Sequence, residues 1–375
     1  MRTPLAWANV VSNKSRTAAS LSGVSFAILL LFMQLGFYDI CFRSSTMIYD
    51  QLDFDVALVS SHYAHLRASN TLALRRVYQA RTVPGVASAV PLYVANGLIR
   101  NPVSRSRREV VVMGVAPEDD PFSLPAIRAA LPRLKRDDTA IMDVLTGAGY
   151  DRVIVGNATE LDDRRIEIVG TYAYGTGFIG DASIIISDRT LSRVYGVPLN
   201  SVSVGLVKLA PGADADEVVR RLAEVMPSDV RVWRRELLEA SEQNFFVRQR
   251  PLGVMFSSGV LLAFAVGAVI LYQVLSSEIT NKLKEYATLK AMGYTNGYMH
   301  FVVVQQAAYF ALLGYLPAVA IAMVMYRSLQ AVTNLPMGMT WARVFFVLAL
   351  SVVMCSGAGM LASLKAARTD PAELF

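Results

Sequence analysis

The stretch from Ala18 to Tyr38 reads AASLSGVSFAILLLFMQLGFY, an apolar run without a charged residue. A bilayer core of about 30 Å needs about 20 predominantly apolar residues in a helix. Three later stretches have the same character and a similar length: Gly253 to Leu275, Phe301 to Met325 and Val344 to Leu364. The spacing predicts a membrane protein with one span, a long interval and then three spans.

The composition agrees with a membrane protein that also carries a folded domain outside the bilayer. Of 375 residues, 54% are hydrophobic and 18% are charged. The sequence pI near 9.3 raises the question of nucleic-acid binding. However, the long interval from Arg43 to Leu252 carries 26 Lys and Arg against 25 Asp and Glu. We therefore expect no nucleic-acid partner.

The excess positive charge lies beside the spans. By the positive-inside rule, this places the N-terminus, the 276–300 loop and the C-terminus in the cytoplasm and the long interval outside it. The residues concerned are Arg2, Lys14, Arg16, Lys282, Lys284, Lys290, Lys365 and Arg368. The predicted organisation is an interfacial helix (1–17), spans at 18–38, 253–275, 301–325 and 344–364, an extracytoplasmic α/β domain with a helical stalk (39–252), a cytoplasmic coupling helix (276–300), a short outer loop (326–343) and a cytoplasmic tail (365–375).

The large domain has the sequence pattern of an α/β fold. Six β-branched runs bounded by turn residues predict strands: Asp55–Ser60, Glu109–Val115, Arg165–Tyr172, Ser183–Ser187, Ser201–Leu209 and Asp229–Trp233. Helical spacing predicts helices at Leu72–Ala80, Pro125–Leu134, Asp214–Met226 and Arg235–Arg248, the last running into the second span. Residues 117–181 are rich in Pro, Asp, Arg and Gly, which indicates a subdomain insert or long loops.

The usual enzymatic motifs are missing from the sequence. A phosphate-binding P-loop needs a Gly-Lys pair, and none of the seven lysines follows a glycine. His62 and His65 could share a metal, but no neighbouring Cys or acid completes a set, so a surface loop is favoured. We expect no catalytic residue, metal or cofactor, and Cys41 and Cys355 are interpreted as packing residues.

The loop between the second and third spans has the pattern of a short amphipathic helix. Ile279, Leu283, Tyr286 and Lys290 recur at helical spacing, and Gly293 suits the position just after a helix end. The small residues Ala287, Thr288 and Ala291 leave backbone accessible, which favours a docking element. An ordinary loop at the membrane surface is the alternative.

Small residues recur at every fourth position of the second span, at Gly259, Ala263 and Gly267. Such faces let helices approach closely, which predicts packing within the chain or against a second copy. No Lys, Arg, Asp or Glu lies mid-span, so we expect no ion or proton relay.

The whole layout resembles the FtsX-like and MacB-type ABC transporter permeases. The loop sequence EYATLKAMGY is similar to their cytoplasmic coupling segment, and the terminal AARTDPAELF is similar to their closing motif. The resemblance is closest to the DevC branch, the heterocyst-glycolipid-type exporter permeases. It extends to PLAW near the start, FMQLGF at Phe32 to Phe37 and TNLP at Thr333 to Pro336, and it is looser in the large domain.

The resemblance implies a homodimer in the bacterial inner membrane that pairs with a separate ABC ATPase subunit. It also implies a periplasmic membrane-fusion adaptor and a TolC-like outer-membrane channel. In this family, motion is passed through the stalk to the outer domain and does not open a conventional transmembrane pore. The residues expected to contact the ATPase are Glu278, Lys282, Leu283, Glu285, Tyr286, Leu289, Lys290 and Gly293.

Two functions follow from the resemblance. The leading one is a non-catalytic permease subunit that couples ATP hydrolysis by its partner to export of a lipid-like or amphiphilic substrate. The alternative is an FtsX-like signalling protein that controls a periplasmic partner without transport. A membrane enzyme is a third, less favoured interpretation.

Overall fold

The chain forms two compact units in a computed structural model, which describes residues 6–7, 14–101, 105–145, 153–175, 182–249, 251–282, 285, 288, 292–333 and 337–367. The helical unit comprises Met1–Asp39, Val254–Gln330 and Met337–Phe375. The α/β unit comprises Ile40–Gly253 and Ala331–Pro336. We describe each unit by itself.

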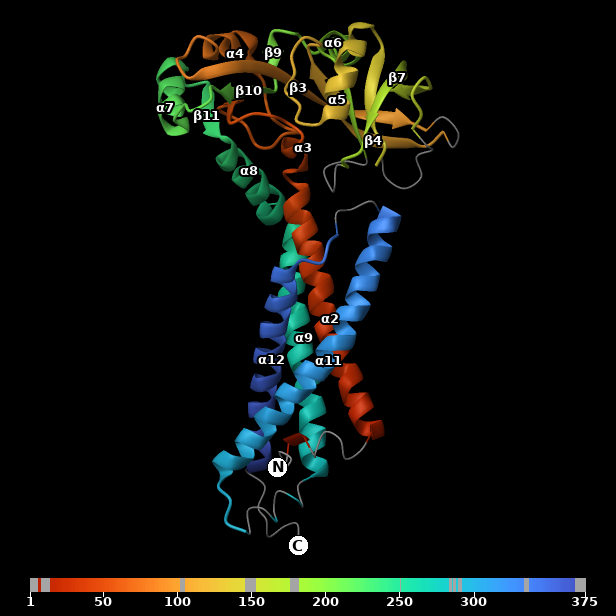
Figure 1. The fold of residues 1–375 in the computed structure, drawn as a ribbon, viewed down its shortest axis with the longest axis vertical. Helices are drawn as coiled ribbons and strands as arrows, with labels where there is room; N and C mark the ends of the chain where they lie inside the picture. Colours follow the sequence, from red (N-terminus) through yellow and green to blue (C-terminus); the bar gives the residue numbers. More distant parts are fainter. Residues whose placement is uncertain are drawn as a thin grey trace. The chain divides into compact units, whose positions relative to one another are not determined.

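Four long helices make up the helical unit (Figure 1): α2 (Lys14–Ser44), α9 (Pro251–Asn281), α11 (Asn296–Thr333) and α12 (Trp341–Ala367). Each contains a segment long and apolar enough to cross a membrane: Thr17–Ser44, Gly253–Asn281, Gly297–Val332 and Trp341–Leu364. The chain is therefore a membrane protein with four spanning helices and an α/β domain between the first and second. This confirms the predicted fold class.

The helices extend beyond the apolar runs that predicted them. Residues 326–343 were expected to form an outer loop, but α11 continues to Thr333 and α12 starts at Trp341. At the other end of α9, the helix continues to Asn281 and takes in the first residues of the expected coupling helix. A helical backbone satisfies its own hydrogen bonds, so it has no reason to end where the side chains become polar. Of the expected interfacial helix at 1–17, the described residues include Trp7, whose ring meets Tyr309 edge-on at 5.5 Å.

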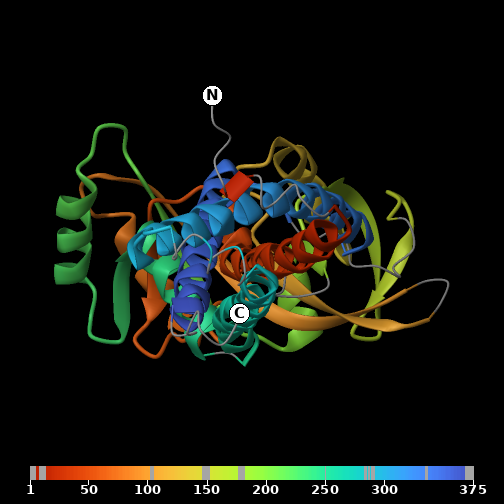
Figure 2. The same cartoon turned by 90° about the horizontal axis from the view of Figure 1, so that it is seen from below.

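The four helices are seen end-on in Figure 2, and glycines lie at several of the contacts between them. A Cβ added at Gly23 of α2 would lie 3.5 Å from Ile270 of α9, and one at Gly314 of α11 would lie 2.7 Å from Val24 of α2. A Cβ at Gly359 of α12 would lie 3.0 Å from Ala307 of α11. Lipid tails are as apolar as leucine side chains, so the hydrophobic effect does not drive membrane helices together. Close packing of the helix backbones therefore supplies much of the free energy of association.

The α/β unit is built on a nine-stranded sheet in the order β11-β1-β10-β3-β4-β8-β5-β7-β6. Its strands are β1 (Val56–Ser60), β3 (Val86–Arg100), β4 (Arg107–Val115), β5 (Thr139–Asp143), β6 (Ala158–Leu161), β7 (Arg164–Tyr172), β8 (Ala182–Ser187), β10 (Val204–Leu209) and β11 (Val230–Arg234). The short strands β2 (Leu72–Ala73) and β9 (Ser201–Val202) pair separately. Pairs β4–β8 and β5–β7 are parallel, and the other pairs of the nine-stranded sheet are antiparallel.

The long strand β3 belongs to two parts of this sheet. Its first half, Val86 to Leu92, pairs with β10, and its second half, Tyr93 to Arg100, pairs with β4. Ile99 and Arg100 also pair with β6. The pairings from β3 through β4, β8, β5, β7 and β6 therefore return to β3 and close a circuit of six strands, which leaves few unpaired edges.

Apolar side chains alternate between the two faces of the sheet. Val56 and Leu58 of β1 face one buried cluster, while Ala57 and Val59 face another. Helices α4 (Leu74–Ala80), α6 (Asp188–Tyr195) and α7 (Ala215–Val225) cover the first face. The second is covered by α3 (Met47–Asp50), α5 (Pro125–Ala130), the 3₁₀ turn η1 (Leu131–Lys135) and α8 (Arg235–Asn244). Strands such as β1, β4, β5, β7 and β8 thus contribute to both cores through their period of two.

Each predicted strand and helix of the α/β unit has a counterpart in the structure. The start expected near Asp214 is present, since its side chain accepts a hydrogen bond from the backbone N–H of Asp216 at 3.0 Å. Strands β2, β3, β5 and β6 and helices α3 and α6 were not expected. Residues 117–181 include β5, β6 and β7, so this part of the chain is an integral portion of the sheet.

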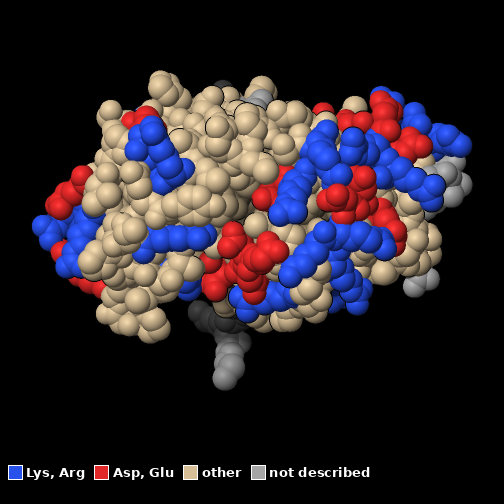
Figure 3. Space-filling view, turned by 90° about the horizontal axis from the view of Figure 1, so that it is seen from above, with Lys and Arg blue, Asp and Glu red and all other residues tan. Residues whose placement is uncertain are grey.

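Charges of both signs are interleaved on the surface of the α/β unit (Figure 3). Pairs such as Arg193 with Asp137 at 2.8 Å and Arg107 with Asp163 at 2.7 Å place each cation beside an acid. This distribution agrees with the near balance of charge counted in the sequence.

Candidate functional site

The expected coupling segment is only partly described, and its first residues are buried. Glu278 has 6% of its surface exposed and accepts a hydrogen bond from the Ser20 hydroxyl at 3.3 Å, while Lys282 is 9% exposed. These side chains pack within the helical unit of the single chain, and their contact with a partner stays a prediction. Their burial follows from the continuation of α9 alongside α2. Glu285 and Thr288 are exposed, and four of the expected contacts lie outside the described residues: Leu283, Tyr286, Leu289 and Lys290.

The end of the coupling segment presents apolar side chains to its surroundings. Gly293 has φ +92°, the left-handed conformation suited to a residue just past a helix end, and the N–H of Met292 donates to the Thr288 carbonyl at 3.0 Å. Met292 is 62% exposed, and the exposed rings of Tyr294 and Tyr298 lie 4.8 Å apart. Sequence reasoning did not single out these three side chains, although their clustering around a glycine was visible.

The small-residue face of the second span packs against two other helices of the same unit. A Cβ on Gly259 would lie 2.6 Å from Gln34 of α2, and Ala263 is buried. A Cβ on Gly267 would meet Met354 of α12 at 2.9 Å. These positions are thus occupied by contacts within the chain.

An ion pair joins the ends of α2 and α12. Arg343 donates to Asp39 at 2.5 Å and to the carbonyl of Gly338 at 2.9 Å, and its guanidinium lies 5.5 Å from the ring centre of Tyr326. The Tyr326 hydroxyl in turn donates to the Phe32 carbonyl. The predicted spans ended one residue before Asp39 and began one residue after Arg343, so this pair was missed. It ties the start of α12 to the end of α2 that leads into the α/β unit.

A buried carboxylate fastens α8 inside the α/β unit. Glu242 is fully buried, and its Oε1 accepts hydrogen bonds from the Tyr63 hydroxyl at 2.5 Å, the Tyr49 hydroxyl at 3.0 Å and the Leu66 N–H at 2.9 Å. Its Oε2 has no hydrogen-bond partner among the described residues. Burial raises the pKa of this carboxyl from 4.5 to about 7, although the three donors oppose the shift. The carboxyl thus joins α8 to α3 and to the segment after β1.

The opposite end of α8 is held by Arg235. Its guanidinium donates to the carbonyls of Tyr49 at 3.1 Å and Leu52 at 3.2 Å, pairs with Glu239 at 2.6 Å and lies 5.0 Å from the ring centre of Phe54. With Glu242 at its other end, α8 is attached to the domain at two points. Directly after it comes the π-helical turn η2 (Phe245–Gln249), and α9 starts at Pro251.

The two histidines considered as metal ligands lie in different surroundings. His62 is exposed, and its Nδ1 lies 3.1 Å from the Ser61 hydroxyl. His65 is only 6% exposed and stacks on Phe245, with ring centres 4.3 Å apart. The expectation of a surface loop is therefore wrong for His65, because the aromatic residues of η2 cover it. No group of three or more His, Cys, Asp or Glu side chains that could hold a metal occurs among the described residues.

Comparison with known families assigns the chain. The MacB-like periplasmic core domain model matches residues 17–225, which is more than half of the sequence, and the FtsX-like permease C-terminal model matches residues 257–371. The chain belongs to the FtsX/MacB-type ABC transporter permeases. Such a permease works with an ABC ATPase subunit. Membership of this family also favours a non-catalytic role for the chain. The closer likeness to the DevC branch stays a prediction.

Related proteins of similar length occur in Mycobacterium tuberculosis. Two uncharacterized ABC transporter permeases, from strains CDC 1551 / Oshkosh and H37Rv, are each 24% identical over 295 residues, covering 78% of this chain and 75% of theirs. Among solved structures, the periplasmic region of MacB from Actinobacillus actinomycetemcomitans gives a TM-score of 0.38 at 8% identity, covering 52% of this permease and 96% of that chain. The extracellular domain of the noncanonic transporter YknZ from Gram-positive bacteria gives 0.34 at 11% identity, covering 48% and 98%.

Proposed function

We propose that the permease is the transmembrane subunit of an ABC exporter that uses ATP hydrolysis by its partner to export a lipid-like or amphiphilic substrate. The observation that carries the proposal is the direct connection of α8, η2 and α9. The stalk helix starts at Arg235, directly after strand β11, and α9 continues to Asn281 at the start of the coupling segment. A displacement of the coupling segment therefore reaches the α/β unit along nearly continuous helix.

The attachment of α8 supports this mechanical role. A helix passes on a displacement only if it is fixed to what it moves, and α8 is fixed by Arg235 and by Glu242. The described Asp, Glu, Lys, Arg and His side chains of the four spanning segments lie near their ends, so the apolar middles favour movement of whole helices over passage of ions.

The remaining assignments complete the proposal. The basic residues beside the spans support cytoplasmic termini in the bacterial inner membrane, with the α/β unit in the periplasm. Exposed apolar side chains on α9 and α12, including Leu261 at 70% and Phe345 at 63%, suit lipid or a second copy in a homodimer. A membrane-fusion adaptor and a TolC-like channel would carry the substrate onward.

Association with the ATPase subunit tests the coupling assignment. We expect Leu283→Glu or Tyr286→Glu to abolish co-purification of the ATPase, because an added charge would enter an apolar contact. Ser328→Glu adds the same charge at an exposed position near the other end of α11 and should leave association unchanged. Retention of the ATPase by both coupling variants would contradict the assignment.

A further inference from the structure

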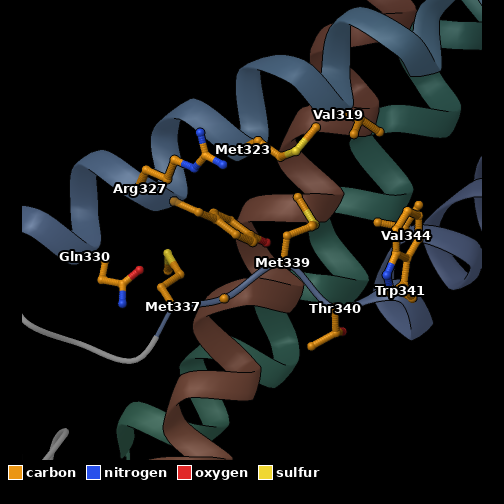
Figure 4. A pocket seen from close by; sticks show the side chains of 11 residues that line it. Val319, Met323, Arg327, Gln330, Met337, Met339, Thr340, Trp341 and Val344 are labelled. Atoms are coloured by element: carbon orange, nitrogen blue, oxygen red, sulfur yellow. The ribbon is translucent and has the colours of Figure 1, made fainter.

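A groove of about 410 Å³ lies where α11 ends and α12 begins (Figure 4). Helix α11 contributes Val319, Met323 and Tyr326, the connecting residues contribute Met337 and Met339, and α12 contributes Trp341 and Val344. The volume is that of a site for a single small ligand. Three methionines give the wall an adaptable apolar surface, which suits chains without one fixed shape.

The groove lies at the membrane surface that α2 reaches at its C-terminal end, just before the chain enters the α/β unit. Helix α2 leads into that unit, and the Asp39–Arg343 ion pair ties the start of α12 to the same end of α2. Trp341 is 78% exposed and stacks on Phe345, an arrangement typical of side chains at headgroup depth. The groove therefore lies at the height of one leaflet's headgroups, the outer leaflet in the proposed orientation.

One edge of the groove carries a cation without an acidic partner. Arg327 is exposed, and no Asp or Glu of the described residues forms an ion pair with it, while Gln330 follows one turn later on α11. The neighbouring Arg343 is already paired with Asp39. The groove thus combines an apolar wall with one net positive charge at its polar edge.

These features select one occupant. A second copy of the chain would present its own Asp39 at this height. That acid already pairs with Arg343 of the same copy, so it would not neutralise Arg327. A helix of another protein would require a broader apolar surface than a groove of this volume provides. A lipid-like molecule with an anionic headgroup satisfies both the apolar wall and Arg327.

We propose that this groove binds an anionic amphiphile of the outer leaflet, with its headgroup on Arg327 and its chain along Met323, Met337 and Met339. The inference rests on the proposed function, because it names the class of amphiphile that the exporter collects. It adds that the substrate is collected from the outer leaflet.

Photolabelling of the full permease in nanodiscs tests the groove. The probes are phosphatidylglycerol and phosphatidylcholine, each carrying a diazirine on an acyl chain, and labelled peptides are mapped by mass spectrometry. We expect the anionic probe to label peptides containing Met323, Met337 or Met339 about fivefold more than the zwitterionic probe, as one cation at a lipid surface would give. Arg327→Gln should abolish this preference and Arg327→Lys should keep it.

Two matched glycine variants separate binding in the groove from general contact with lipid. Gly338 lines the groove and Gly357 lies on α12, and neither would place a Cβ within 4 Å of another group. We expect Gly338→Leu to fill the groove and lower its labelling by both probes, and Gly357→Leu to leave it unchanged. Equal labelling by both probes, or a preference retained in Arg327→Gln, would overturn the proposal, as would crosslinks of these peptides to a second copy or another protein in place of lipid.

The outcome is distinguishable from failure of the proposed function. If Arg327→Gln has no effect while the coupling variants still release the ATPase, the groove assignment is wrong and the exporter assignment stands. If the groove selects the anionic probe but both coupling variants retain the ATPase, the groove assignment stands and the exporter assignment is wrong.

Discussion

The buried carboxyl of Glu242 makes the attachment of α8 dependent on pH. Its pKa is about 7 in the folded domain because of burial, against 4.5 as its ordinary value. Between these two values the folded state keeps a proton that the opened state has lost, so the free energy of opening falls as pH rises. Below pH 4.5 the full stability is present, and above pH 7 the loss is complete.

The size of the effect follows from the shift. A change of one pKa unit corresponds to about 1.4 kcal/mol, so the attachment of α8 should weaken by about 3 kcal/mol across this window. The equilibrium constant for local opening would rise on the order of a hundredfold. Glu242 has no exposed surface in the folded domain, so solvent screening does not reduce this figure.

Hydrogen exchange of the full permease in detergent measures this opening. Amide exchange in peptides covering α8 and residues 60–66 is compared at pH 5 and pH 8, after correction for the intrinsic pH dependence of exchange. Glu242→Gln keeps the shape of the side chain but cannot ionise, so its opening constant should be independent of pH. Glu236→Gln changes an exposed acid on the same helix and should keep the rise.

The neighbouring groups set the remaining controls. Burial raises the pKa of both Tyr49 and Tyr63 well above 10, so neither loses a proton in this range. His65 is the nearby histidine, two residues beyond Tyr63 and stacked on Phe245. Because Glu242 is the group that causes the rise in the opening constant with pH, this rise should persist in His65→Gln. The reasoning is refuted if the corrected opening constant of the unmodified permease is the same at both pH values, or if Glu242→Gln retains the rise.

Two further predictions concern the helical unit, both measured by unfolding in mixed detergent micelles. Asp39→Asn leaves the 7%-exposed Arg343 side chain unpaired and should cost about 3 kcal/mol, whereas the Asp39→Asn, Arg343→Gln double variant should cost less. Equal stability of Asp39→Asn and the unmodified permease would contradict this. Gly36→Leu would collide with the Tyr326 side chain and should cost about 1–3 kcal/mol, while Gly357→Leu meets open space. Similar losses from both glycine variants would show that packing at Tyr326 is not the cause.

The spans and most strands were predictable because each depends on a local pattern. The longest strand was not. β3 contains Pro91, Gly97 and several small residues, which are poor strand formers in isolation. It is extended because β10, β4 and β6 supply its hydrogen-bond partners, and those contacts come from distant parts of the sequence.

The most specific contacts had no signal in the sequence. Glu242 lies in RELLEASEQN, which looks like an ordinary amphipathic surface helix. It is buried because Tyr49 and Tyr63, 193 and 179 residues earlier, direct their hydroxyls at it. Asp39 and Arg343 are 304 residues apart and each looks like a polar residue at the end of a span. Pairs of this kind arise from tertiary structure alone.

The position of β1 determines when the α/β unit can fold. Val56 pairs with Val207 of β10 on one side and with Arg234 of β11 on the other. Strand β1 therefore stays unpaired until nearly the whole domain has been synthesised. Contacts so distant in sequence make folding slow and leave an apolar strand open to aggregation meanwhile. Helix α9 starts at Pro251, soon after β11 ends at Arg234, so synthesis of this spanning helix begins as the sheet first becomes able to close.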